Sequence, residues 1–168
     1  MLRDRLLLGV WIGLVAAAAT AGALVGFGWV RGTPMHPLNT LAHIVVGSRA
    51  FHVRTVDAVV TTMGMTVHVL SIVVWGLLFS LALARARGIR LWATALVFAA
   101  IVAVFDFVVV PDRLSPGFDA MLTRGELVVL YAVMAVAMAG AARMRNEDQS
   151  ERGTRTEEAP GMVFGRRS

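Results

Sequence analysis

The chain has 168 residues, of which 57% are hydrophobic and 16% are charged, and its mean hydropathy is +0.71. This composition is too apolar for a soluble domain of the same length, and it predicts an all-α integral membrane protein with several membrane-spanning helices. Cysteine is absent, which excludes disulfides, thiolate metal sites and cysteine nucleophiles. The net charge of +5 comes from arginines at the ends of apolar segments. Because that pattern is typical of topology signals, we expect the partner to be a lipid bilayer and not a nucleic acid.

The first apolar segment covers residues 6–30. It is longer than the hydrophobic region of a signal peptide, which has about 7 to 15 residues, so we expect an uncleaved transmembrane helix. Two pairs of glycines, each spaced by four residues, lie on different faces of this helix: Gly9 with Gly13, and Gly22 with Gly26. Such pairs favour close packing against neighbouring helices.

A polar connection with two prolines, Pro34 and Pro37, follows the first span. Asn39 is the expected N-cap and Gly47 the expected C-terminal stop of a short helix over residues 40–46. One side of that helix is aliphatic and the other is polar. We therefore expect a short amphipathic or re-entrant helix that lies at the interface or dips into the bundle.

The second predicted span, residues 56–83, carries one histidine at its centre. On a helix that turns by about 100° per residue, six residues that interrupt the aliphatic pattern fall in one narrow arc. They are Asp57, Thr61, Gly64, His68, Ser71 and Trp75. Lipid cannot form hydrogen bonds with these polar groups, so we expect the arc to face protein or a wet cavity.

Two further spans are predicted, over residues 91–110 and 126–142. The first of them contains Asp106 about one turn before its end, on the same face as several alanines. The second begins with Glu126, where the helix dipole favours a carboxylate. The four spans together predict a four-helix bundle.

The arginines predict the orientation of the bundle, because short cytoplasmic loops carry an excess of basic residues. Three groups fall on one side: Arg3 and Arg5; Arg85, Arg87 and Arg90; and Arg143 and Arg145. We therefore expect a multi-pass protein of the bacterial inner membrane with both termini in the cytoplasm. Residues 146–168 are polar, mixed in charge and without periodicity, so they predict a disordered cytoplasmic tail after a transmembrane domain over residues 1–145.

With this orientation, histidines and carboxylates lie in the outer half of the bundle or near its midplane. A carboxylate that faces an imidazole inside a membrane could relay protons or bind a ligand. The structural alternative is that His68 binds a neighbouring helix through Thr61, Ser71 or a backbone carbonyl, and that Asp106 binds an arginine or the end of the short helix. The candidate residues of a polar pocket open to the outer side are His43, Asp57, Thr61, His68, Ser71 and Asp106.

Four histidines are candidate metal ligands, since imidazole suits zinc, copper and iron. They are His36, His43, His52 and His68. Their spacing matches no metal-binding signature. A bis-histidine haem would require His43 and His68 to face each other across the bundle. We therefore expect no cofactor, with haem or a transition metal as the alternative.

Two short motifs, AHIVVG at residues 42–47 and GMTVH at residues 64–68, follow a proline in the order short helix, then polar-striped span. In this order, residues 34–83 resemble small four-helix bacterial inner-membrane proteins of unknown function. The resemblance implies the same topology and a pairing of His43 with His68. It implies no reaction.

These features predict a non-enzymatic accessory or interaction subunit, with a membrane-protein partner or a second copy of itself. No motif of a hydrolase or of a nucleotide-binding enzyme is present in the sequence. The first alternative is a haem- or metal-binding redox protein that uses His43 and His68. The second is proton-coupled transport of a small solute, which would need an oligomer because the chain has no internal repeat.

Overall fold

The computed structural model describes residues 2–82, 86–111 and 113–157 of the chain. Within them, four helices are long and apolar enough to cross a membrane, over Leu2–Val30, Ala58–Leu81, Ile89–Val109 and Arg124–Arg145. The described residues are all helix and connection, with no strand. This confirms the all-α four-helix bundle, and each predicted span falls on one of the four helices.

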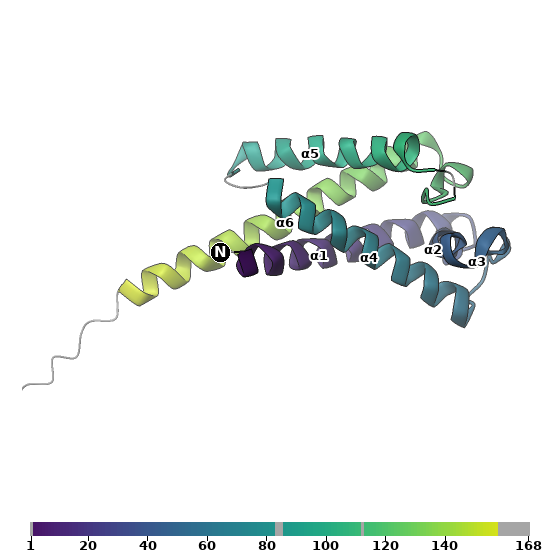
Figure 1. The fold of residues 1–168 in the computed structure, drawn as a ribbon, viewed down its shortest axis with the longest axis horizontal. Coiled ribbons are helices and arrows are strands. Elements are labelled where there is room, and N and C mark those ends of the chain that lie inside the picture. The colour runs from purple at the N-terminus through teal and green to yellow at the C-terminus, as the bar shows by residue number, and fades with distance from the viewer. Residues whose placement is uncertain (1, 83–85, 112, 158–168) are drawn as a thin grey trace, which may run out of the picture.

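Helix α1 (Leu2–Val30) lies at the centre of the bundle and packs against both α4 (Ala58–Ala82) and α6 (Arg124–Glu157). Helix α5 (Ile89–Val104) packs mainly on α6 and has few direct contacts with α4 (Figure 1). The start of α1, the end of α4 and the start of α5 lie at one end of the bundle. The short helices α2 and α3 lie at the other end, together with the connection from α5 to α6.

The contact between α1 and α4 is close because glycines lie on both sides of it. A Cβ atom on Gly13 would lie 2.5 Å from the Cα of Val73, and one on Gly76 would lie 2.6 Å from the backbone oxygen of Gly9. This confirms the close packing predicted for the first glycine pair of α1. The second pair points away from the bundle: a Cβ atom on Gly22 or on Gly26 would have no neighbouring atom within 4 Å.

The segment before α4 forms α2 (His36–Leu41), α3 (His43–Val46) and the 3₁₀ helix η1 (Gly47–His52). The prediction of one helix over 40–46 with Asn39 as its N-cap is therefore wrong. Pro37 lies in the first turn of α2, where a proline needs no N–H partner, so the helix begins earlier than predicted. Gly47 ends α3 with a positive φ of 74°, as predicted.

Helix α2 is inserted into the bundle rather than lying on its surface. Leu38 and Asn39 are fully buried, and a Cβ atom on Gly64 of α4 would lie 2.1 Å from the backbone oxygen of Leu38. Asn39 donates from its amide to the backbone oxygens of Val53 at 2.9 Å and Thr55 at 2.8 Å. Its side chain therefore holds the connection to α4 instead of capping a helix.

The third span ends in a π-helical turn, η2 (Phe105–Val109), which continues α5 and stops before Pro111. A further 3₁₀ turn, η3 (Phe118–Ala120), precedes α6. Thr123 and Glu126 form a reciprocal capping box at the start of α6, where the Glu126 carboxylate accepts from the backbone N–H of Thr123 at 2.8 Å. Arg31, just after α1, forms an ion pair with the same carboxylate.

Helix α6 is longer than the predicted span and continues to Glu157. Residues 146–157 of the predicted tail belong to this helix, while residues 158–168 lie outside the described part. A helix that is already nucleated extends at little cost through residues without proline, and the first proline of this segment is at position 160. The polar composition alone did not indicate this.

Candidate functional site

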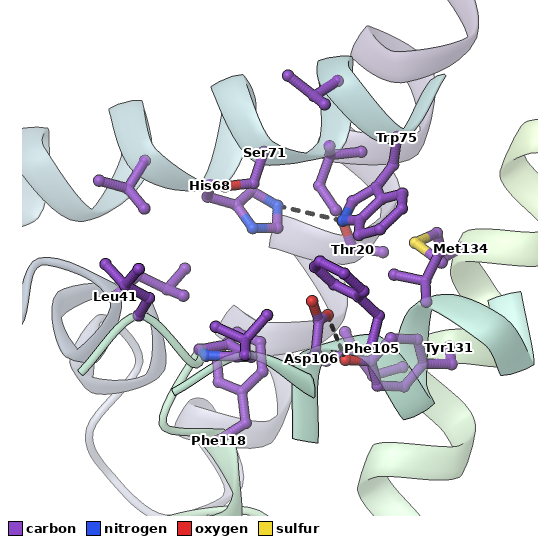
Figure 2. A pocket seen from close by; sticks show the side chains of 18 of the residues that line it. Thr20, Leu41, His68, Ser71, Trp75, Phe105, Asp106, Phe118, Tyr131 and Met134 are labelled. Atoms are coloured by element: carbon purple, nitrogen blue, oxygen red, sulfur yellow. Dashed lines mark hydrogen bonds between the residues drawn. The ribbon is translucent and has the colours of Figure 1, made fainter. Parts of the chain in front are cut away.

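A cavity of about 300 Å³ lies between α1, α4, α6 and the π-helical turn η2. Its lining is mainly aliphatic and aromatic, with a small number of polar side chains from four helical segments (Figure 2). These are Thr20, His68, Ser71, Asp106 and Tyr131. A mostly apolar pocket with a few convergent polar groups is typical of a small-molecule site.

His68 forms one polar wall of the cavity and is 4% exposed. Its Nε2 atom lies 3.1 Å from the backbone oxygen of Ala17 and 3.1 Å from Oγ1 of Thr20. Because a carbonyl oxygen only accepts, Nε2 carries the proton and Nδ1 holds the lone pair. Figure 2 shows the second ring nitrogen on the side of the cavity.

Asp106 and Tyr131 form the opposite wall. The Tyr131 hydroxyl donates to Oδ2 of Asp106 at 2.8 Å, which joins α6 to η2. Asp106 is the second residue of the π-helical turn. Single π-helical turns within helices occur frequently at functional sites, because the extra residue re-aims the side chains around it. Here the turn lies where the only carboxyl group of α5 and η2 meets the cavity.

Aromatic side chains close one end of the cavity. The Trp75 ring of α4 meets the Phe105 ring edge to face, with centroids 5.3 Å apart, and meets Phe98 of α5 at 6.1 Å. These contacts join α4 to α5 and η2 where the backbones have few contacts of their own. At the other end the lining comes from Leu41 and Phe118 (Figure 2).

The outward-facing residues of the lining mark the side on which the cavity opens. Val74 is 54% exposed, Phe105 is 40% exposed and Leu114 is 54% exposed. Ser71 is exposed as well. The opening therefore lies between α4 on one side and η2 with its following loop on the other. In a membrane-spanning bundle this flank faces lipid.

Three predicted site residues lie outside the lining. Asp57 is exposed and acts as the N-cap of α4, accepting from the backbone N–H groups of Val59 at 3.0 Å and Val60 at 2.8 Å. Thr61 donates to Oδ1 of Asn39 at 2.7 Å and so ties α4 to α2. The cavity thus brings together only His68, Ser71 and Asp106 of the six predicted residues.

His43 is the third predicted site residue that lies outside the lining of the cavity. Its Nδ1 atom donates to the backbone oxygen of Thr40 at 2.8 Å, and its ring packs against Phe51 with centroids 4.8 Å apart. Its buried Nε2 atom has no hydrogen-bond partner among the described residues. The ring edge lies under Gly117, where a Cβ atom would be 3.3 Å from Cε1 of His43.

The four histidines considered as metal ligands have separate surroundings. His36 bonds through Nε2 to the backbone oxygen of Phe51 at 2.8 Å, and His52 is exposed. Over the described residues, no three His, Cys, Asp or Glu side chains are grouped so that they could hold a metal ion. Of the side chains that could bind a metal ion, those of His68 and Asp106 line the cavity.

Two polar residues of the cavity were not predicted. Tyr131 is the only tyrosine of the chain and stands within a predicted span, which is a signal that could have been used. Thr20 interrupts a run of alanines in α1, but nothing in its spacing points to His68. Thr20 meets His68 of the polar arc and Tyr131 meets Asp106 of η2, and both contacts depend on the tertiary packing.

Comparison of the chain with protein-family models, with curated proteins and with solved structures finds no match. The class of the protein is therefore inferred from its fold and its cavity alone. The fold is that of an all-helical, multi-pass membrane protein with four helices long enough to span the bilayer. Its site is a mostly apolar cavity with polar groups on two opposite walls.

Proposed function

We propose that this is a non-enzymatic, multi-pass protein of the bacterial inner membrane that binds a small amphipathic molecule in the cavity between α4 and η2. The observation that carries the proposal is the position of His68 and Asp106 on opposite walls of one otherwise apolar cavity. Its volume of about 300 Å³ lies at the lower end of small-molecule pockets. Such a molecule would place its polar group between the two walls and its apolar part along the lining.

The opening of the cavity supports uptake from the bilayer. Because the exposed lining residues belong to α4, to η2 and to the loop after it, a molecule dissolved in lipid would reach the cavity sideways. A water-soluble solute would have to pass the end lined by Leu41 and Phe118. The ligand that fits this geometry is one that already partitions into the membrane.

The orientation follows from the arginines in this proposal. Arg5 and Arg90 lie in the first turns of α1 and α5, which begin at the same end of the bundle. Arg143 follows residues of α6 that pack in one cluster with the first turn of α5. If that end is cytoplasmic, as the excess of arginine favours, then α2, α3 and the loop before α6 face the outer side. The cavity then lies in the outer half of the membrane. The resemblance of residues 34–83 to small four-helix inner-membrane proteins supports the same topology.

Native mass spectrometry of the protein released from its membrane tests the proposal. Ser71→Trp places a large side chain in the opening of the cavity, and Leu70→Trp places the same side chain on the neighbouring outward-facing position, where Leu70 is 61% exposed. We expect the wild type and Leu70→Trp to retain a small amphipathic molecule and Ser71→Trp to lose it. Equal retention in both variants, or none in the wild type, would contradict the proposal.

A further inference from the structure

The atoms of His68 and Asp106 that face the cavity are hydrogen-bond acceptors, one on each wall, while Ser71 and Trp75 of the lining carry a hydroxyl and an indole N–H. Nε2 of His68 donates to Ala17, so Nδ1 presents a lone pair to the cavity. On the other wall the Tyr131 hydroxyl is already used as a donor to Asp106. A carboxylate accepts hydrogen bonds and donates none. The donors for these two acceptors must therefore come from the bound molecule.

The charge of the lining has one sign. Among the described residues around the cavity, Asp106 is the acidic one, and neither arginine nor lysine is present. Its hydrogen-bond partner is the neutral hydroxyl of Tyr131. A carboxylate inside a membrane is costly unless a cation pairs with it. The missing counter-charge is thus another property that the ligand would supply.

The aromatic residues add to the same preference. Trp75, Phe105 and Phe118 all line the cavity, and Figure 2 shows Phe105 beside Asp106. The faces of aromatic rings attract cations, and the attraction is stronger where water is excluded. Aromatic walls around one carboxylate favour a cation over a neutral head group of the same size.

From these observations we propose that the ligand is an amphipathic ammonium, a membrane-dissolved amine in its protonated form. Its N–H groups bind the carboxylate of Asp106 and Nδ1 of His68, and its hydrocarbon part lies along the apolar lining. This inference rests on the proposed function, because it names the chemical class of the molecule in the same cavity. Ser71 lies at the opening and accepts a further N–H bond.

Binding of three decyl compounds that differ only in the head group tests the inference. The protein is placed in lipid nanodiscs with Trp75 as its single tryptophan and the other three replaced by phenylalanine. The fluorescence of Trp75 is then titrated with n-decylammonium, n-decanol and n-decanoate. Asp106→Asn removes the charge but keeps an acceptor for Tyr131, and Asp119→Asn removes an exposed charge of η3 as the matched control.

We expect saturable binding of n-decylammonium, with n-decanol and n-decanoate weaker by about tenfold or more. Asp106→Asn should weaken the ammonium by about tenfold, and Asp119→Asn should leave it unchanged. Decanol that binds as tightly as the ammonium, or an unchanged affinity in Asp106→Asn, overturns the inference. If decanol binds as tightly as the ammonium and Ser71→Trp blocks its binding, the cavity remains a binding site, and only the proposal of an ammonium ligand is refuted. If none of the three compounds binds saturably, the proposed function is overturned as well.

Discussion

The hydroxyl of Tyr131 donates a hydrogen bond of 2.8 Å to Oδ2 of Asp106, and this bond joins α6 to the π-helical turn at the end of the third span. It holds the carboxylate at the wall of the cavity. A phenol and a carboxylate from two different spans thus form one polar unit within an apolar surface. The bond defines the geometry of this wall.

Tyr131→Phe removes this bond and keeps the aromatic ring. Hydrogen bonds between membrane helices contribute about 0.6 kcal/mol on average and about 1.7 kcal/mol at most, so we expect a loss of about 1 kcal/mol in the free energy of unfolding. Steric trapping in bicelles measures this quantity. In a double-mutant cycle with Asp106→Ala, which removes the acceptor of this bond, an interaction energy of zero would show that the two side chains do not act together.

His68 is predicted to stabilise the contact of α4 with α1. His68→Ala loses the bond to Ala17 and leaves a void, which should lower the free energy of unfolding by about 2 kcal/mol. His68→Gln keeps an N–H donor at a similar distance, so we expect it to cost about 0.5 kcal/mol. The same unfolding measurement compares the two variants. A glutamine variant as unstable as the alanine variant would argue against the bond to Ala17.

Gly64 is predicted to be essential for the docking of α2 onto α4. A Cβ atom there would lie 2.1 Å from the backbone oxygen of Leu38, so Gly64→Ala must push the two helices apart, at a cost of about 2 kcal/mol. Gly22→Ala is the matched control, because nothing lies within 4 Å of that position. The control should be neutral or stabilising by up to about 1 kcal/mol, since alanine favours the helix. We therefore expect a lower thermal unfolding temperature for Gly64→Ala than for Gly22→Ala, and the reverse order would contradict the prediction.

Asn39 holds three segments together. Its amide donates to Val53 and Thr55, and its oxygen accepts from Thr61. Asn39→Asp has the same shape but no donor, and it sets a carboxylate against two carbonyl oxygens. We expect it to destabilise the protein by about 3 kcal/mol, which is as much as Asn39→Ala or more. An aspartate variant with wild-type thermal stability would refute this account of the α2 segment.

The four spans were predictable because length and apolar composition alone determine which segments can cross a bilayer. The close packing at Gly9 and Gly13 was also predictable, since small residues four apart lie on one helix face. The start of α2 was not, because the position of Pro37 in the first turn outweighed the capping signal of Asn39. The extension of α6 to Glu157 depended on propagation from the span, which a polar composition does not reveal.

The residues of the polar arc of α4 have different surroundings and roles: Gly64 and His68 are buried, whereas Asp57 and Ser71 are exposed. Asp57 caps the helix and Thr61 binds α2, whereas His68 and Ser71 face the cavity. Helical periodicity gives the direction of a side chain and not the identity of the neighbour it meets. Thr20 of α1 binds His68, and Tyr131 of α6 binds Asp106 across the same cavity, so only the packed bundle brings these pairs together.

The central claim is that an amphipathic molecule occupies the cavity between α4 and η2, and methyl NMR in nanodiscs tests it most directly. Ile72 and Met134 line the cavity, whereas Ile101 and Met144 face outward and are 59% and 60% exposed. On titration with n-decylammonium, we predict saturable shifts and intermolecular NOEs at the methyl groups of Ile72 and Met134, with Ile101 and Met144 changing little. Equal, non-saturating changes at all four methyl groups would mean that the compound only partitions into the lipid, and they would contradict the account.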